Sequence, residues 1–116
     1  GTANYILSEM TTRGMDFEAA LADAQDLGYA EADPTFDIEG FDTAHKLCVL
    51  IRMAYGVDYP LAELPVQGIT SVTPMDIEFA REFGYRVKLL AGRTPRPGAL
   101  HLSAGTSGRQ LQCRAP

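Results

Sequence analysis

Apolar residues recur at three- and four-residue steps in four stretches of the chain, and this spacing predicts four amphipathic helices. A glycine follows each stretch, and glycine readily adopts the left-handed conformation in which helices end. The third stretch is the most apolar, so we expect it to form the central buried helix. Three of the helices are predicted over about residues 2–13, 16–27 and 73–83. The third in chain order is predicted to start between residues 37 and 40 and to end at about residue 55.

The clearest strand signal is Tyr85–Ala91, where the charged Arg86 and Lys88 alternate with apolar residues. Weaker strand signals lie at Gly68–Val72 and Ala99–Leu102. A single strand is not stable alone, so its partners must come from these segments or from a second chain. We therefore expect a homo-oligomer.

Composition divides the chain into two parts. Residues 1–92 hold all the strong periodicity and predict one globular domain, whereas residues 93–116 are rich in Arg, Pro and Gly and predict a loose tail or an edge strand. No apolar run is long enough to cross a bilayer, and no signal segment opens the chain, so no membrane partner is expected. The start at Gly1 predicts a processed end or the edge of a fragment.

Charge and cysteine content narrow the class further. The chain has a formal charge of −5, and residues 1–91 hold all 15 acids. Such an acidic body argues against a nucleic-acid partner and suits a small cationic or zwitterionic ligand. Cys48 and Cys113 stand far apart and suggest no disulfide framework, which favours a reducing cytoplasm. His45 and His101 make no metal-ligand spacing with them, so no metal is expected.

The candidate chemistry lies in Ala24–Lys46, where five acids within the twelve positions 31–42 are followed by a single lysine. Asp42 and Lys46 are four positions apart and share one face of a helix. They are either an exposed ion pair, or a pair facing a cleft in which burial and Asp42 tune Lys46 to move a proton. The sequence leaves both interpretations open. The five acids are Glu31, Asp33, Asp37, Glu39 and Asp42.

Other kinds of site fit this stretch less well. A calcium loop needs acids at alternating positions and a later bidentate Glu, but Pro34 and Phe36 interrupt the acids here. No glycine-rich phosphate loop is present. Neither histidine lies near a nucleophile motif, and His45 adjoins Lys46 in sequence, so it points elsewhere on a helix and is expected to be structural.

The spacing A-x3-G-Y-A-x2-D-P-x2-D-I-x-G-x-D-x3-K, from Ala24 to Lys46, resembles the signature of homoserine dehydrogenase. The opening GTANYIL resembles a segment near the start of that family's substrate domain. Gly68-Ile69 and the stretch from Gly84 to Leu89 also fall where the family has similar residues. The resemblance covers about residues 1–91.

The resemblance implies an NAD- or NADP-dependent enzyme that interconverts L-homoserine and L-aspartate 4-semialdehyde in threonine and methionine biosynthesis. It implies an α+β fold, with helices packed on one face of a small mixed sheet that also forms the dimer interface. It assigns proton transfer to Lys46 beside Asp42, and the substrate's amino group to Glu31. Asp37 would complete the polar site. Thr2 and Tyr29 would line the pocket.

Two features differ from the family pattern. The glycine fingerprint and ribose-binding acid of a Rossmann domain are absent from these residues. The residues after Arg93 do not resemble the family's continuation. We therefore expect little turnover from this chain alone. Two further hypotheses stay open: a degenerate homologue that acts in dimerisation or regulation, and a sensor that binds an amino acid through Glu31.

Overall fold

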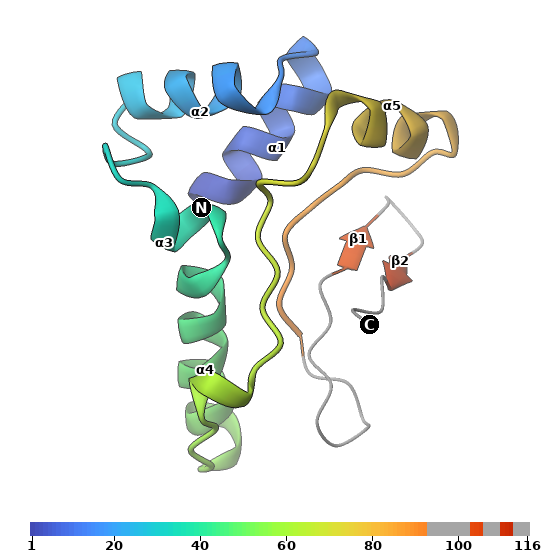
Figure 1. The fold of residues 1–116 in the computed structure, drawn as a ribbon. Coiled ribbons are helices and arrows are strands. Elements are labelled where there is room, and N and C mark those ends of the chain that lie inside the picture. Colours follow the sequence, from blue (N-terminus) through green and yellow to red (C-terminus); the bar gives the residue numbers. More distant parts are fainter. Residues whose placement is uncertain (93–102, 106–109, 113–116) are drawn as a thin grey trace.

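The computed structural model describes residues 1–92 and, in the tail, the backbone of residues 103–105 and 110–112 (Figure 1). Residues 1–92 form five α-helices and one 3-10 turn, joined by loops: α1 (Thr2–Arg13), α2 (Phe17–Asp26), α3 (Thr35–Ile38), α4 (Phe41–Tyr55), η1 (Leu61–Glu63) and α5 (Pro74–Glu82). In the tail, β1 (Ser103–Gly105) pairs antiparallel with β2 (Gln110–Gln112).

Helix α1 lies at the centre of the fold. It contacts α2, α3 and α5, and Figure 1 shows it between α2 and α5. Its residues Ile6, Leu7 and Met10 are the most deeply buried large side chains, with exposed fractions of 0%, 0% and 2%. They pack with Ile69 of the loop and Ile77 of α5. The principal core is thus built around the first helix.

The helix starts follow from their caps. Asp16 caps α2, because its carboxylate accepts a hydrogen bond of 2.8 Å from the Ala19 amide. Thr73 caps α5 in a reciprocal box with Asp76. The predicted starts at these two residues are confirmed. Gly1 holds the cap position of α1, so no side chain caps that helix.

The prediction that the third helix is the central buried one is wrong. Helix α4 buries Ala44 and Leu47 against Leu64 in a small second core, and Cys48 and Ile51 pack partly against it, but several of its large apolar side chains are exposed. Met53 is 78% exposed and Leu50 is 60% exposed. In Figure 1, α4 extends away from the group formed by α1, α2 and α5. An apolar sequence shows what a helix could bury, but not whether the described residues include its partner.

The predicted α+β class with a mixed sheet is also wrong. The described part of the chain is helical apart from the β1–β2 pair, and no mixed sheet is seen in it. Gly68–Val72 forms no strand, and Tyr85–Ala91 forms only an isolated bridge at Arg86. Ala99–Leu102 lies outside the described residues. An oligomer contact through that sheet therefore has no counterpart in the described residues.

The segment predicted as a strand is instead held by a side chain. The Asn4 amide nitrogen donates to the Leu89 carbonyl at 3.0 Å, and the Leu89 amide donates to the Asn4 side-chain oxygen at 2.8 Å. The side chain thereby supplies the donor and the acceptor that a neighbouring strand would offer. One helical turn after Asn4 on α1, the Ser8 hydroxyl accepts a hydrogen bond of 2.7 Å from the Lys88 ammonium. These contacts fix residues 88–89 along α1.

A close backbone contact sets the place of α3 and α4. The Ile69 amide donates to the Ile38 carbonyl at 2.8 Å. A Cβ added to Gly68 would lie 2.3 Å from that carbonyl oxygen, so only glycine fits there without movement. Between the two helices, Gly40 has a φ of 87° and turns the chain from α3 into α4.

Candidate functional site

A polar cleft of about 250 Å³ lies where the start of α1 meets α3 and the start of α4. Figure 1 shows the N-terminal end of the chain beside α3 at this junction. The cleft brings together residues more than thirty positions apart in the sequence. Its lining consists of Gly1, Thr2, Ala3, Asn4, Asp37, Asp42, Thr43 and Leu89.

The first turn of α1 forms one side of the cleft. Gly1 holds the cap position and has no side chain to satisfy the amides of that turn. The Thr2 hydroxyl donates to the Tyr29 carbonyl at 2.8 Å. Since a hydroxyl has only one proton to donate, Thr2 can offer only an acceptor to a ligand.

Asp37 and Asp42 form the opposite side. Asp37 lies in the four-residue helix α3. Just before this helix, the Asp33 carboxylate accepts hydrogen bonds from the amide and the hydroxyl of Thr35. These bonds lower the pKa of Asp33. Asp42 lies in the first turn of α4, where the helix dipole favours a carboxylate. The turn at Gly40 is what brings both acids to one cleft.

Lys46 is paired with Asp42 at the edge of this cleft. Its ammonium lies 2.6 Å from Asp42 Oδ2, one helical turn away. The side chain of Lys46 is 69% exposed and that of Asp42 is 32% exposed, so the pair is not buried. The hydrogen bond and charge of Asp42, with a smaller contribution from Asp37, raise the pKa of Lys46. Burial does not tune this lysine as the proton-transfer hypothesis expected, and Lys46 is positively charged at neutral pH.

Asp42→Asn is expected to lower the pKa of Lys46 towards its ordinary value, because the main cause of the increase is removed. Since the folded-state pKa is raised, the ion pair stabilises the fold below the unfolded lysine pKa of about 10.4. This stabilisation is lost as the pH rises through the higher folded value. A titration of the Lys46 side chain by NMR measures the shift.

The control for that titration is Asp58→Asn, which removes the partner of Arg52 at the far end of α4. It should leave the pKa of Lys46 unchanged. If Asp42→Asn also leaves it unchanged, the ion pair does not persist in solution.

Three of the predicted site residues are not part of the cleft lining: Lys46, which pairs with Asp42 of the lining, Tyr29 and Glu31. Tyr29 reaches it only through its carbonyl, which accepts from Thr2, and 57% of the residue is exposed. Glu31 is exposed, and its carbonyl oxygen accepts a hydrogen bond of 2.9 Å from the Gln25 side chain. The structure therefore brings Thr2, Asp37 and Asp42 together, places Lys46 at the edge and leaves Glu31 outside the lining.

Five residues of the lining were not predicted as part of a site: Gly1, Ala3, Asn4, Thr43 and Leu89. The first three belong to the opening GTANYIL, Thr43 follows Asp42, and Leu89 belongs to the predicted strand. The neighbouring acid is a signal that could have found Thr43. No local signal reveals that residues 4 and 89 meet.

A second cleft, largely apolar and of about 270 Å³, adjoins the polar one and shares Thr43 and Leu89 with it.

Aromatic rings connect α3 to α4. The ring centroid of Phe36 lies 5.3 Å from that of His45 and 6.5 Å from that of Phe41. His45 of α4 thus contacts Phe36 of α3, although both residues are exposed.

The described residues contain no cluster of His, Cys, Asp and Glu that could hold a metal ion. Cys48 is a free thiol, and Cys113 lies outside the described residues. None of the helices described is both long and apolar enough to cross a bilayer.

The cleft and the spacing of its acids can be compared with known proteins. Residues 1–110 match a protein family described as homoserine dehydrogenase. The chain belongs to the homoserine dehydrogenase family. The family match continues past residue 91, where the sequence analysis expected the resemblance to end.

Individual members of the family agree with this assignment. The Helicobacter pylori homoserine dehydrogenase is 48% identical over 113 residues, which cover 97% of this chain and 27% of that protein. The Pseudomonas aeruginosa enzyme is 50% identical over 90 residues, which cover 78% and 21%. A crystal structure of S. aureus homoserine dehydrogenase matches with a TM-score of 0.75 and 36% identity, over 97% of this chain and 25% of that one. The chain thus spans about a quarter of the length of these relatives.

Proposed function

We propose that this chain carries the substrate-binding and proton-transferring groups of a homoserine dehydrogenase, an enzyme that interconverts L-homoserine and L-aspartate 4-semialdehyde with NAD or NADP. The observation that carries the proposal is the convergence of Thr2, Asp37 and Asp42 on one cleft, with Lys46 paired at its edge. Membership of the family supports the same reaction.

The cleft has groups that complement both charged ends of an amino acid. Asp37, Asp42 and the Thr2 hydroxyl offer acceptors for an ammonium or hydroxyl group. The uncapped amides in the first turn of α1 offer donors, and the helix dipole there favours a carboxylate. A zwitterionic substrate would therefore be oriented between α1 on one side and the two acids on the other.

Lys46 is the residue that would handle the proton. At neutral pH it is protonated, so it can donate a hydrogen bond or a proton to an oxygen that gains negative charge. Asp42 holds the ammonium at the edge of the cleft and would thereby orient it towards the reacting oxygen. In this arrangement Asp42 positions Lys46, and Asp37 adds to the negative field around it.

The nicotinamide cofactor does not fit the described residues. A Rossmann site needs a strand that leads through a glycine-rich loop into a helix, and residues 1–92 contain no such unit. Residues outside the described part would have to bind the cofactor and decide between NAD and NADP. The cytoplasmic location, the dimer and the role in threonine and methionine biosynthesis remain predictions.

The proposal is tested by adding homoserine to the ¹⁵N-labelled chain and following amide shifts. We expect shifts at Thr2, Asp42 and Thr43, and binding weakened by Asp37→Asn. 2-Aminobutyrate, which lacks the hydroxyl, should bind about three- to tenfold more weakly because it makes one hydrogen bond fewer. The control variant Asp58→Asn should bind homoserine like the unmutated chain. No shift at saturating homoserine would overturn the proposal.

A further inference from the structure

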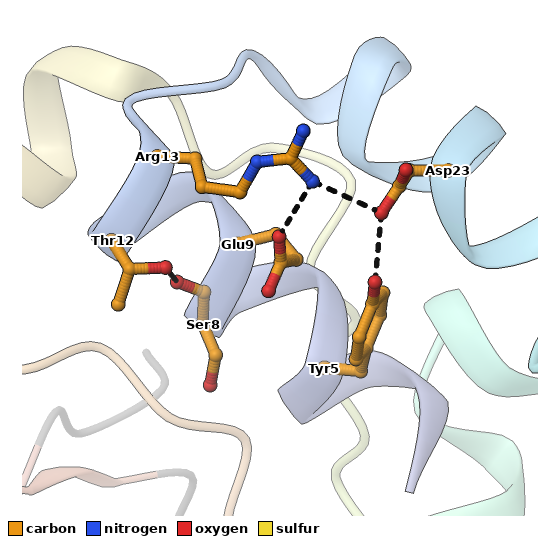
Figure 2. Close-up of polar contacts among 6 residues, drawn as sticks. All are labelled: Tyr5, Ser8, Glu9, Thr12, Arg13 and Asp23. Atoms are coloured by element: carbon orange, nitrogen blue, oxygen red, sulfur yellow. Dashed lines mark hydrogen bonds and ion pairs between the residues drawn. The ribbon is translucent and has the colours of Figure 1, made fainter.

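A polar network outside the cleft joins α1 to α2. Figure 2 shows Tyr5, Arg13 and Asp23 directed towards one another. The Tyr5 hydroxyl donates to Asp23 Oδ2 at 2.7 Å. Arg13 Nη1 lies 3.4 Å from the same oxygen and 3.0 Å from Glu9 Oε2. Asp23 therefore accepts from two residues of α1, one near each end of that helix.

The ring of Tyr5 extends this network to Tyr29. The two rings meet edge to face, with centroids 5.0 Å apart and planes at 63°. This is a favourable geometry for an aromatic pair. Because Asp23 fixes the hydroxyl, the half-buried ring of Tyr5 has one preferred orientation, and Tyr29 packs against a fixed surface.

The main chain of Tyr29 leads from this network into the cleft. The Tyr29 amide donates to the Ala24 carbonyl at 2.8 Å, which holds the residue at the end of α2. The Tyr29 carbonyl accepts the Thr2 hydroxyl proton, and Thr2 lines the cleft. The position of Tyr29 thus decides which way the free electron pairs of Thr2 face.

We propose that Tyr5 is a positioning residue for the substrate: held by Asp23, it fixes Tyr29, whose carbonyl keeps the Thr2 hydroxyl as an acceptor for the substrate. This inference rests on the proposed function and deepens it. Arg13 acts one step further away, because it contacts Asp23, and Glu9 acts only through its ion pair with Arg13. Tyr5 itself does not line the cleft.

The protonation of Tyr5 agrees with this role. The hydrogen bond to Asp23, followed by partial burial and by the charges of Asp23 and Glu9, raises the pKa of Tyr5 to about 12. The hydroxyl therefore keeps its proton, and its hydrogen bond to Asp23, across the pH range in which an enzyme would work.

The test is a double-mutant cycle between Tyr5→Phe and Thr2→Val, read as the dissociation constant of homoserine for the 116-residue chain. Tyr5→Phe keeps the ring and removes only the hydroxyl. It should weaken homoserine binding about three- to tenfold, the effect of one hydrogen bond. In the Thr2→Val background the same change should have no further effect, because Tyr5 acts through the Thr2 hydroxyl.

A general loss of structure would give a different result. If Tyr5→Phe weakens binding equally with and without Thr2, or does not weaken it, the positioning role is overturned. Tyr59→Phe is the matched control, since Tyr59 packs in the second core and its hydroxyl makes no hydrogen bond within the described part. Thermal unfolding of each variant shows whether the fold is kept. If the unmutated chain does not bind homoserine, the proposed function itself fails.

Discussion

Lys46→Met is expected to lower the turnover of homoserine about 10²- to 10⁴-fold, the usual contribution of a positioned acid or base. The assay needs a nicotinamide-binding domain in addition to this chain, for example one joined to it from a relative. The large effect follows from the chemistry, because Lys46 is the only cation paired at the edge of the cleft among the described residues. Homoserine affinity should change much less than turnover.

The fold should survive this change, since the Lys46 side chain is 69% exposed. Lys46→Arg separates charge from proton transfer: guanidinium keeps the charge but does not give up its proton, so turnover should stay low. Arg52→Ala breaks an exposed ion pair on the same helix, far from the cleft, and should leave turnover unchanged. Full turnover in Lys46→Met would contradict the catalytic role of this lysine.

Gly68→Ala is expected to destabilise the chain by about 1–3 kcal/mol, the usual cost of forcing an extra carbon into a packed site. The added Cβ would lie 2.3 Å from the Ile38 carbonyl oxygen and 2.6 Å from the Glu39 Cα. Both neighbours are backbone atoms and cannot rotate away. The end of α3 must therefore move, and Asp37 with it, so homoserine binding should also weaken. Urea unfolding and the homoserine titration measure the two effects.

Gly92→Ala is the matched control, because an added Cβ there meets nothing within 4 Å. It should change neither stability nor binding. Normal stability and normal affinity in Gly68→Ala would show that the segments at Ile38 and Gly68 separate easily in solution.

The helices could largely be predicted from the sequence, because their signals are local. Asp16 and Thr73 act as caps through atoms three residues away, and Gly14 and Gly56 end their helices with positive φ. Helix α3 is only four residues long and gives no periodic signal, so it was not predicted.

The prediction of a sheet was wrong for a different reason. Alternating residues in Tyr85–Ala91 correctly indicate one buried position at Leu89, but alternation cannot identify a hydrogen-bond partner. That partner is the side chain of Asn4, 85 positions away.

The site was predictable where spacing carries the information. Asp42 and Lys46 pair because four residues make one helical turn. The exposure of Lys46 was not predictable, because it depends on how far α4 extends from the rest of the fold. The family resemblance named the acids, but only the turn at Gly40 and the contact at Gly68 explain why Asp37 meets Thr2.

The hydrogen bonds between Asn4 and Leu89 also affect how the protein folds while it is being synthesised. The ribosome releases α1 before Leu89, and one wall of the cleft cannot form until Leu89 has emerged, because Asn4 and Leu89 are 85 positions apart. Until then the buried face of α1 lacks Ile69, Ile77 and Leu89, three of its core partners. Contacts this distant in sequence slow folding and expose apolar surface to aggregation and to chaperones. The nascent chain therefore acquires the geometry of the cleft late, after most of its helices can already exist.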